Sequence, residues 1–137
     1  MLDSNVLQAL TDVQHSFHAV ALELFETYQQ RSSEVLICPV VYTEAHSFPM
    51  FQADVYIEFF ADAGIEIDWQ IPELAWTLAG LAQAAHHERR RKSGVTEQRK
   101  LMADFVIGAH ALAREAILLS FDTGYRALFP LLELRSG

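Results

Sequence analysis

The sequence predicts an α/β fold in which helices flank a short, mostly parallel central sheet. Apolar residues recur at helical spacing in several stretches, and short, strand-like apolar runs separate these stretches. Short strands separated by helices are typical of βα units around a parallel sheet that is covered on both faces. With 137 residues, of which 51% are hydrophobic, the chain is expected to form one domain over residues 1–137 with a full core.

The predicted elements follow one another closely along the chain. Helices are expected at 13–28, 40–48, 51–63, 72–91 and 105–114, and strands at 35–38, 65–67, 117–120 and 131–134. The first helix is predicted because apolar residues from Phe17 to Tyr28 follow the i, i+3, i+4 spacing of an amphipathic helix. Pro39 is expected to end the first strand, and Gly64 the helix at 51–63.

In the second half, Pro72 suits the first turn of a long helix, and Gly94 lies beyond its expected end. Asp104 opens a very apolar helix. The run Ile117 to Ser120 is predicted to be a buried strand. Ligands of open α/β sheets bind beyond the carboxyl ends of the strands, so polar residues just after a strand are the best candidates for function.

The chain is acidic, with a net charge of −8, and its basic residues are concentrated in one stretch. Six of the ten lysine and arginine residues fall between Arg89 and Lys100. The net charge excludes nucleic-acid binding by a general basic surface, but not binding through one local strip or through cations held on carboxylates. A solvated helix end is the simpler interpretation of the run Arg89, Arg90, Arg91 and Lys92, and an RNA-binding strip is the alternative.

Several classes of protein are excluded by what the sequence lacks. A single cysteine, Cys38, allows no intramolecular disulfide and no CxxC zinc site. Dinucleotide, P-loop and GxSxG motifs are absent, and the adjacent His86 and His87 are expected to be surface groups. No apolar run approaches the ~20 residues of a membrane span, and the first residues lack a basic leader. A soluble, cytoplasmic protein is expected.

Carboxylates near the expected strand ends are the remaining signal. They are Asp3, Glu44, Asp104 and Asp122. Asp104 has a structural alternative as a helix cap, and Asp122 as a turn residue. Glu44 is harder to explain in this way, because it lies in an otherwise apolar segment. Four acids at one sheet edge repel one another unless cations are bound, and the hard ions Mg²⁺ or Mn²⁺ suit oxygen ligands.

The chain resembles the PIN domain family, and more closely its VapC-like toxins, at four places in the family order. The segments are Leu2-Asp3-Ser4-Asn5-Val6-Leu7, Pro39-Val40-Val41-Tyr42-Thr43-Glu44, Ala103-Asp104-Phe105-Val106-Ile107-Gly108-Ala109-His110, and Leu119-Ser120-Phe121-Asp122-Thr123-Gly124-Tyr125 with Phe129-Pro130 after it. The third segment is the most specific. The resemblance implies a three-layer PIN-like fold with a short, mostly parallel sheet between helices.

The resemblance also implies a metal-dependent endoribonuclease, the toxin of a type II toxin–antitoxin pair. Asp3, Glu44 and Asp104 would anchor one Mg²⁺ or Mn²⁺, and Asp122 would hold a second ion or orient water. Asn5 and Ser120 are expected to orient these carboxylates. The expected substrate is single-stranded or loop RNA. The expected partners are an antitoxin protein and a second copy of the chain, with no membrane.

Two other functions remain open from the sequence. A non-catalytic PIN-like assembly or regulatory module is the main alternative. A phosphohydrolase acting on small phosphate esters would use similar acidic chemistry. It would normally require an Asp-x-Asp pair or an additional lysine near the site, and neither is expected beside Asp3 or Asp122.

One departure from the family concerns the first strand. Only Met1 and Leu2 precede Asp3, whereas family members carry several apolar residues before this aspartate. Either the central strand is truncated, or the true start lies upstream.

Overall fold

In the computed structural model, which describes residues 1–32, 34–94 and 100–137, helices surround a small parallel sheet. The first part of the chain contains α1 (Ser4–Thr11), α2 (His18–Gln29), β1 (Val35–Ile37), α3 (Pro39–Ala45), α4 (Ala53–Ala63) and β2 (Ile65–Ile67). It is followed by α5 (Glu73–Ser93), α6 (Met102–Ala113), β3 (Leu118–Leu119), α7 (Tyr125–Leu128) and β4 (Leu134–Arg135). The predicted α/β class is therefore confirmed.

The sheet is joined at its centre by a single residue, Leu2. Strands β1 and β2 pair in parallel, and so do β3 and β4. Leu2 forms parallel bridges to Ile37 of β1 and to Leu119 of β3, and it is completely buried. The Leu2 amide donates to the Leu36 carbonyl at 2.9 Å, and the Asp3 amide donates to Leu119 at the same distance. The central strand is thus present in a very short form, and it lies between the two pairs.

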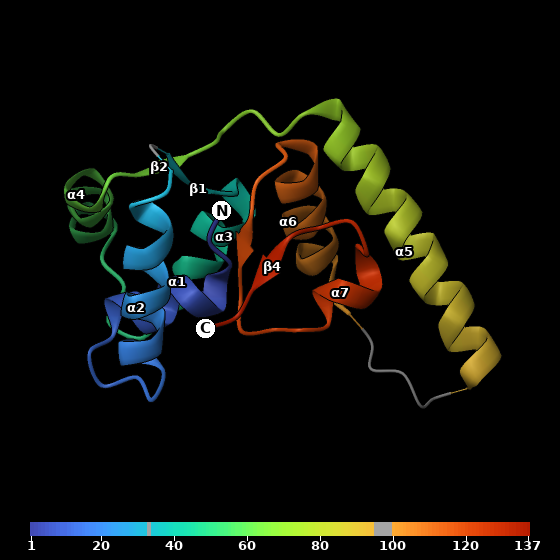
Figure 1. Ribbon diagram of the computed structural model, residues 1–137, viewed down its shortest axis with the longest axis horizontal. Helices are drawn as coiled ribbons and strands as arrows, with labels where there is room; N and C mark the ends of the chain where they lie inside the picture. Colours follow the sequence, from blue (N-terminus) through green and yellow to red (C-terminus); the bar gives the residue numbers. More distant parts are fainter. Residues whose placement is uncertain (33, 95–99) are drawn as a thin grey trace.

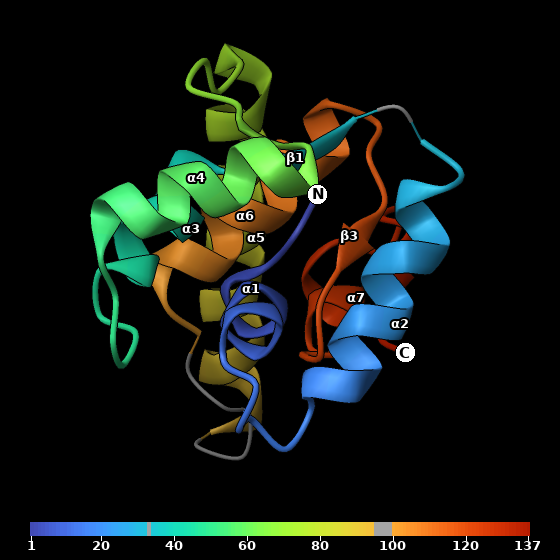
Figure 2. The same cartoon turned by 90° about the vertical axis from the view of Figure 1, so that its left-hand side faces the viewer.

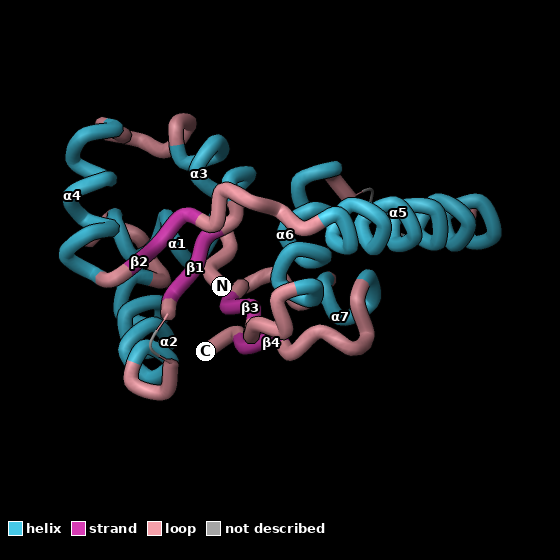
Figure 3. Tube along the Cα trace, turned by 90° about the horizontal axis from the view of Figure 1, so that it is seen from above, coloured by secondary structure: helices cyan, strands magenta, loops and turns pink. Residues whose placement is uncertain are grey.

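Helices lie on both sides of these strands, as the views in Figures 1 and 2 show. Helices α1, α2 and α4 are on one side, and α5, α6 and α7 are on the other (Figure 1). Helix α3 contacts both α1 and α6. Seen from above, α5 extends away from the strands beyond α6, its main packing partner (Figure 3). The layers meet at the completely buried Val6, Ile37 and Leu118.

A partly buried ionic network fixes the carboxyl end of α6 to the residue that follows β2. The Arg114 guanidinium donates to both carboxylate oxygens of Asp68, at 2.7 and 3.1 Å, and to the Gln70 carbonyl at 2.8 Å. The ring of His110, which is completely buried, lies 2.8 Å from the same carboxylate. Burial raises the pKa of Asp68, but the hydrogen bonds from Arg114 and His110 outweigh it, so that the pKa is lowered.

Some element boundaries differ from the sequence prediction, for local reasons. The helix expected at 13–28 begins only at His18, because the Asp12 carboxylate accepts the Gln14 amide at 3.0 Å and turns the chain. Helix α7 was not predicted. The last strand is β4 rather than 131–134, because the Leu132 amide still donates to Phe129 in a turn.

Among the described residues, the helices are too short or too polar to cross a bilayer.

Gly108 marks the closest approach of α6 to the C-terminal segment. A Cβ atom at this position would lie 2.4 Å from the ring of Phe129 and 3.0 Å from that of Tyr125. We therefore expect Gly108→Ala to lower the free energy of unfolding by roughly 1–3 kcal/mol, through overpacking. Denaturant unfolding measures this directly.

Gly80 provides the matched control, because it is an exposed helical glycine and a Cβ atom added there would have no neighbour within 4 Å. Gly80→Ala is expected to stabilise the protein by up to about 1 kcal/mol, since alanine has the higher helix propensity. Equal effects of the two substitutions would contradict the close packing of α6 on Phe129.

Candidate active site

Asp3 lies at the carboxyl end of the central strand, and hydrogen bonds fix its carboxylate. Its side chain is buried, with 6% of the residue exposed. The Ser4 amide donates to Oδ1 at 2.8 Å. The Ser120 hydroxyl donates to Oδ2 at 2.6 Å, and the Asn5 amide group donates to the same oxygen at 3.1 Å. The orientation of this carboxylate is therefore set by the protein itself.

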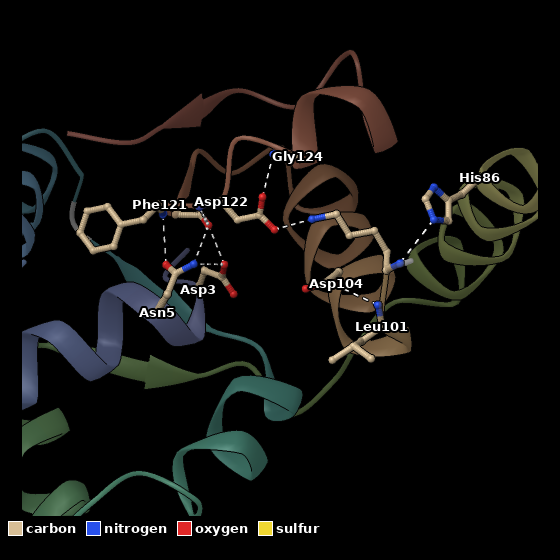
Figure 4. Close-up of polar contacts among 10 residues, drawn as sticks. Asp3, Asn5, His86, Leu101, Asp104, Phe121, Asp122 and Gly124 are labelled. Atoms are coloured by element: carbon tan, nitrogen blue, oxygen red, sulfur yellow. Dashed lines mark hydrogen bonds and ion pairs between the residues drawn. The ribbon is translucent and has the colours of Figure 1, made fainter. Parts of the chain in front are cut away.

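Asn5 and Ser120 also connect Asp3 to the segment that follows β3 (Figure 4). The Asn5 side chain donates to the Ser120 hydroxyl at 3.2 Å and accepts the Phe121 amide at 3.1 Å. The Asp122 amide donates to the same hydroxyl at 3.0 Å. The two residues expected to orient the carboxylates are thus in contact with Asp3 and hold the backbone of Asp122 near it.

Glu44 and Asp104 approach this edge from two different helices. Glu44, on α3, accepts the Ser4 hydroxyl at 2.6 Å. Asp104 is in the first turn of α6 and accepts the Leu101 amide at 3.1 Å. Asp104 therefore does cap its helix, as the structural alternative proposed, and its carboxylate also lies within the electrostatic reach of the other acids.

The charges of neighbouring acids affect the pKa of Asp3. The pKa of Asp3 is raised to about 6. Burial is the main cause, the charges of Asp104 and Glu44 add to it, and hydrogen bonds from Ser120 and Ser4 act against it. This pattern indicates that the negative charges face a common region.

Lys100 is a cation within this acidic region that the sequence analysis missed. Its Nζ lies 2.6 Å from Oδ2 of Asp122. Burial alone would raise the pKa of Asp122, but the Lys100 hydrogen bond, the Gly124 amide and the Lys100 charge lower it. Burial also raises the pKa of Asp104, with Lys100 acting against this shift and Asp122 adding to it. The sequence argument that no lysine stands near Asp122 was therefore wrong, because the chain folds back to bring Lys100 beside it.

Tyr125 is a second residue that the sequence analysis did not select for a role. It is 1% exposed and faces the acidic residues. Its pKa is raised by burial and then by the charges of Asp3, Asp104 and Asp122. A buried hydroxyl therefore lies beside the acidic residues.

These acids fit a hard divalent cation in their chemistry, but they do not close around a common point. Within residues 1–32, 34–94 and 100–137, no three His, Cys, Asp or Glu side chains are close enough together to hold a metal ion. Carboxylate oxygens are the ligands that Mg²⁺ and Mn²⁺ prefer.

The basic run lies at the end of α5. Arg91 and Lys92 are exposed and both pair with Glu88, whereas Arg89 and Arg90 are partly buried. Arg99, in the same stretch of sequence, lies outside the described residues.

The prediction of two surface histidines just before this run is half wrong. His87 is exposed, but His86 is 1% exposed and accepts the Lys100 amide at 3.3 Å (Figure 4). His86 lies one helical turn before Arg89. The basic run therefore begins next to the point where α5 contacts Lys100, four residues before Asp104.

Comparison with known proteins decides the family. A family model described as the PIN domain matches residues 1–128. The chain belongs to the PIN domain family. Among curated proteins, none matches this PIN domain significantly.

Solved structures share the fold at low sequence identity. VapBC2 from Rickettsia felis, bound to a DNA fragment from its promoter, superposes with a TM-score of 0.68 at 17% identity, covering 98% of this chain and 96% of that chain. FitAcB from Neisseria gonorrhoeae superposes with a TM-score of 0.61 at 15% identity, covering 98% and 95%. The fold predicted from the four motifs is therefore confirmed.

The raised pKa of Asp3 predicts a specific pH dependence. Folded Asp3 keeps its proton up to a pH of about 6, whereas the ordinary aspartate pKa of 3.8 applies to the unfolded chain. Ionisation of this group therefore lowers wild-type stability as pH rises from about 4 to about 6. In EDTA, the stability of Asp3→Asn relative to wild type should rise over this window by up to about 3 kcal/mol. Urea unfolding at several pH values measures the difference.

Asp62→Asn is the control, because Asp62 is exposed on α4. Its stability relative to wild type should stay nearly constant over the same pH range. A flat profile for Asp3→Asn as well would show that Asp3 ionises normally in the folded protein.

Proposed function

We propose that this PIN domain is an endoribonuclease that depends on Mg²⁺ or Mn²⁺ and cleaves single-stranded or loop RNA. The observation that carries the proposal is Asp3, a buried and rigidly held carboxylate that faces the charges of Asp104 and Glu44. Such a group destabilises the folded protein unless a cation offsets it. Members of the PIN domain family are generally metal-dependent nucleases.

Each acidic residue has a role in this proposal. Asp3, Glu44 and Asp104 would hold a divalent cation, and Asp122 would hold a second ion or orient water. A bound ion would activate the attacking water and stabilise the departing oxygen. The protein's own contribution is to fix the carboxylates before RNA binds. For Asp3, this is achieved by the hydrogen bonds that it accepts from Asn5 and Ser120.

Single-stranded RNA is the substrate that this geometry suits best. The acids are carried by the ends of the central strand and β3 and by helices α3 and α6, and a flexible single strand can bring its scissile phosphate to them more readily than a duplex can. The basic residues Arg89, Arg90, Arg91 and Lys92 follow the part of α5 that contacts Lys100. They would attract the RNA backbone beside an otherwise acidic site.

We also propose that the protein is the toxin of a type II toxin–antitoxin pair. The VapBC2 and FitAcB structures, which share this fold, support the proposal. An arginine or lysine of an antitoxin would pair with the carboxylates. Apolar side chains exposed on α4, and separately on α5 at the other side of the molecule, offer two surfaces for an antitoxin or for a second copy of the chain. They are Val55, Ile57, Leu74, Trp76 and Leu81.

A non-catalytic PIN-like assembly module is the second candidate. The observation that favours it is the lack, among the described residues, of three side chains already close enough to bind a metal. The two candidates differ in whether the purified protein cleaves RNA.

RNA cleavage should require both the metal and Asp104. With Mg²⁺ or Mn²⁺ the protein should cleave single-stranded RNA, EDTA should stop cleavage, and Asp104→Asn should lower the rate on the order of 100-fold or more. The apo stability of this variant should change by less than about 0.5 kcal/mol, because asparagine keeps an acceptor for the Leu101 amide and relieves repulsion. Gel-based cleavage rates and thermal unfolding are the measurements.

Asp62→Asn, which removes an exposed carboxylate, should cleave at the wild-type rate. Cleavage that persists in EDTA would exclude the proposed mechanism. A wild-type protein that cleaves no RNA with either metal would favour the assembly module.

The salt dependence of RNA binding tests the basic residues. We expect the double substitution Arg91→Gln and Lys92→Gln to weaken binding and to reduce the slope of log K against log salt by up to about 1.4, since each single-strand phosphate contact contributes roughly 0.7. Both residues are exposed, so thermal stability should barely change. Arg31→Gln removes an exposed arginine elsewhere and is the control. An unchanged slope in the double variant would leave these residues as a solvated helix end.

A further inference from the structure

Lys100 is built into the acidic site rather than placed on its surface. Its side chain is only 16% exposed, and its Nζ lies 2.6 Å from Oδ2 of Asp122. The backbone amide of Lys100 is fixed as well, because it donates to the buried ring of His86 at 3.3 Å. The chain has one other lysine, Lys92, whose side chain is 78% exposed.

Gly124 leaves the space that this lysine occupies. A Cβ atom at position 124 would lie 2.6 Å from Nζ of Lys100 and 2.8 Å from Oδ1 of Asp122. The backbone of Gly124 has a φ of −59°, which any residue can adopt, so its conformation does not require glycine. Glycine at this position instead leaves space for the Lys100 ammonium group beside the Asp122 carboxylate.

The two oxygens of Asp122 are both engaged by groups of the protein. Oδ1 accepts the Gly124 amide at 2.7 Å, and Oδ2 accepts the Lys100 ammonium. Asp3, Glu44 and Asp104 have no ammonium group bound to them in the described part of the chain. A divalent cation bound to Asp122 would therefore meet a positive charge already in contact with that carboxylate, and the two would repel each other.

We propose that Lys100 is a resident cation that takes the place of a second metal ion at Asp122. The site then binds one divalent ion, on the side of Asp3, Glu44 and Asp104, and the ammonium group supplies the second positive charge toward a bound phosphate. This inference rests on the proposed nuclease function and narrows its metal content from one or two ions to one.

Calorimetric titration with Mn²⁺ tests the inference without relying on activity. The wild-type protein should bind one Mn²⁺ per chain. Lys100→Met should bind a second ion and should bind the first one roughly tenfold more tightly, which is the size that Coulomb's law gives in water for a divalent ion roughly 6 Å from an ammonium group. Lys100→Arg keeps the charge and should still bind one ion. Arg31→Met removes an exposed cation outside the acidic site and should match wild type in Mn²⁺ stoichiometry and affinity.

The possible outcomes separate the inference from the function on which it rests. Thermal unfolding in EDTA first establishes that each variant is folded. Two ions bound by wild type, or the same stoichiometry and affinity in Lys100→Met and wild type, would overturn the role of Lys100 while leaving the nuclease proposal intact. No Mn²⁺ binding by either protein, together with no RNA cleavage, would overturn both.

Discussion

The position of Leu2 between β1 and β3 is the constraint on which the rest of the structure depends. This one residue bridges the two strand pairs, and its neighbour Asp3 is carried to the carboxyl edge by the same hydrogen bonds. Because the central strand is so short, few backbone contacts hold it. The side-chain contacts of Asn5 and Ser120 supply the remaining attachment, so that the same groups complete the sheet and orient the carboxylate.

Burying several carboxylates at one edge of the sheet destabilises the folded protein, and neighbouring groups offset part of this cost. Asp3 is compensated by neutral donors, which leave its pKa raised, whereas Asp122 is compensated by a full positive charge, which lowers its pKa. The region is therefore electrostatically uneven. Negative charge that lacks a cationic partner is concentrated toward Asp3, at the end of the central strand.

Much of this arrangement could be predicted from local sequence. The helices α3 to α6 and the strand β1 follow from apolar periodicity and from Pro39 and Gly64, because these signals act within a few residues. The carboxylates Asp3 and Asp122 could be placed at one edge because both follow a strand of a parallel sheet. A truncated central strand was one of the two alternatives that the sequence left open, and the other was a start upstream of Met1.

The features that could not be predicted depend on contacts between distant segments. Lys100 appears in the sequence as part of a basic run, and only the packing of its segment against α5 and α7 brings it to Asp122. His86 is buried because it faces this same segment, whereas its neighbour His87 is exposed. The start of α2 was missed because the Asp12 turn competes with the helical pattern that precedes His18.

The ionic network of Asp68, His110 and Arg114 has a consequence for how the acidic edge can adjust. It fastens the carboxyl end of α6 to β2, while Gly108 presses the middle of the same helix against Phe129. Helix α6 is thus attached to the rest of the protein at two points along its length. These attachments fix the direction of the helix axis, and with it the position from which the first turn presents Asp104 to the other acids.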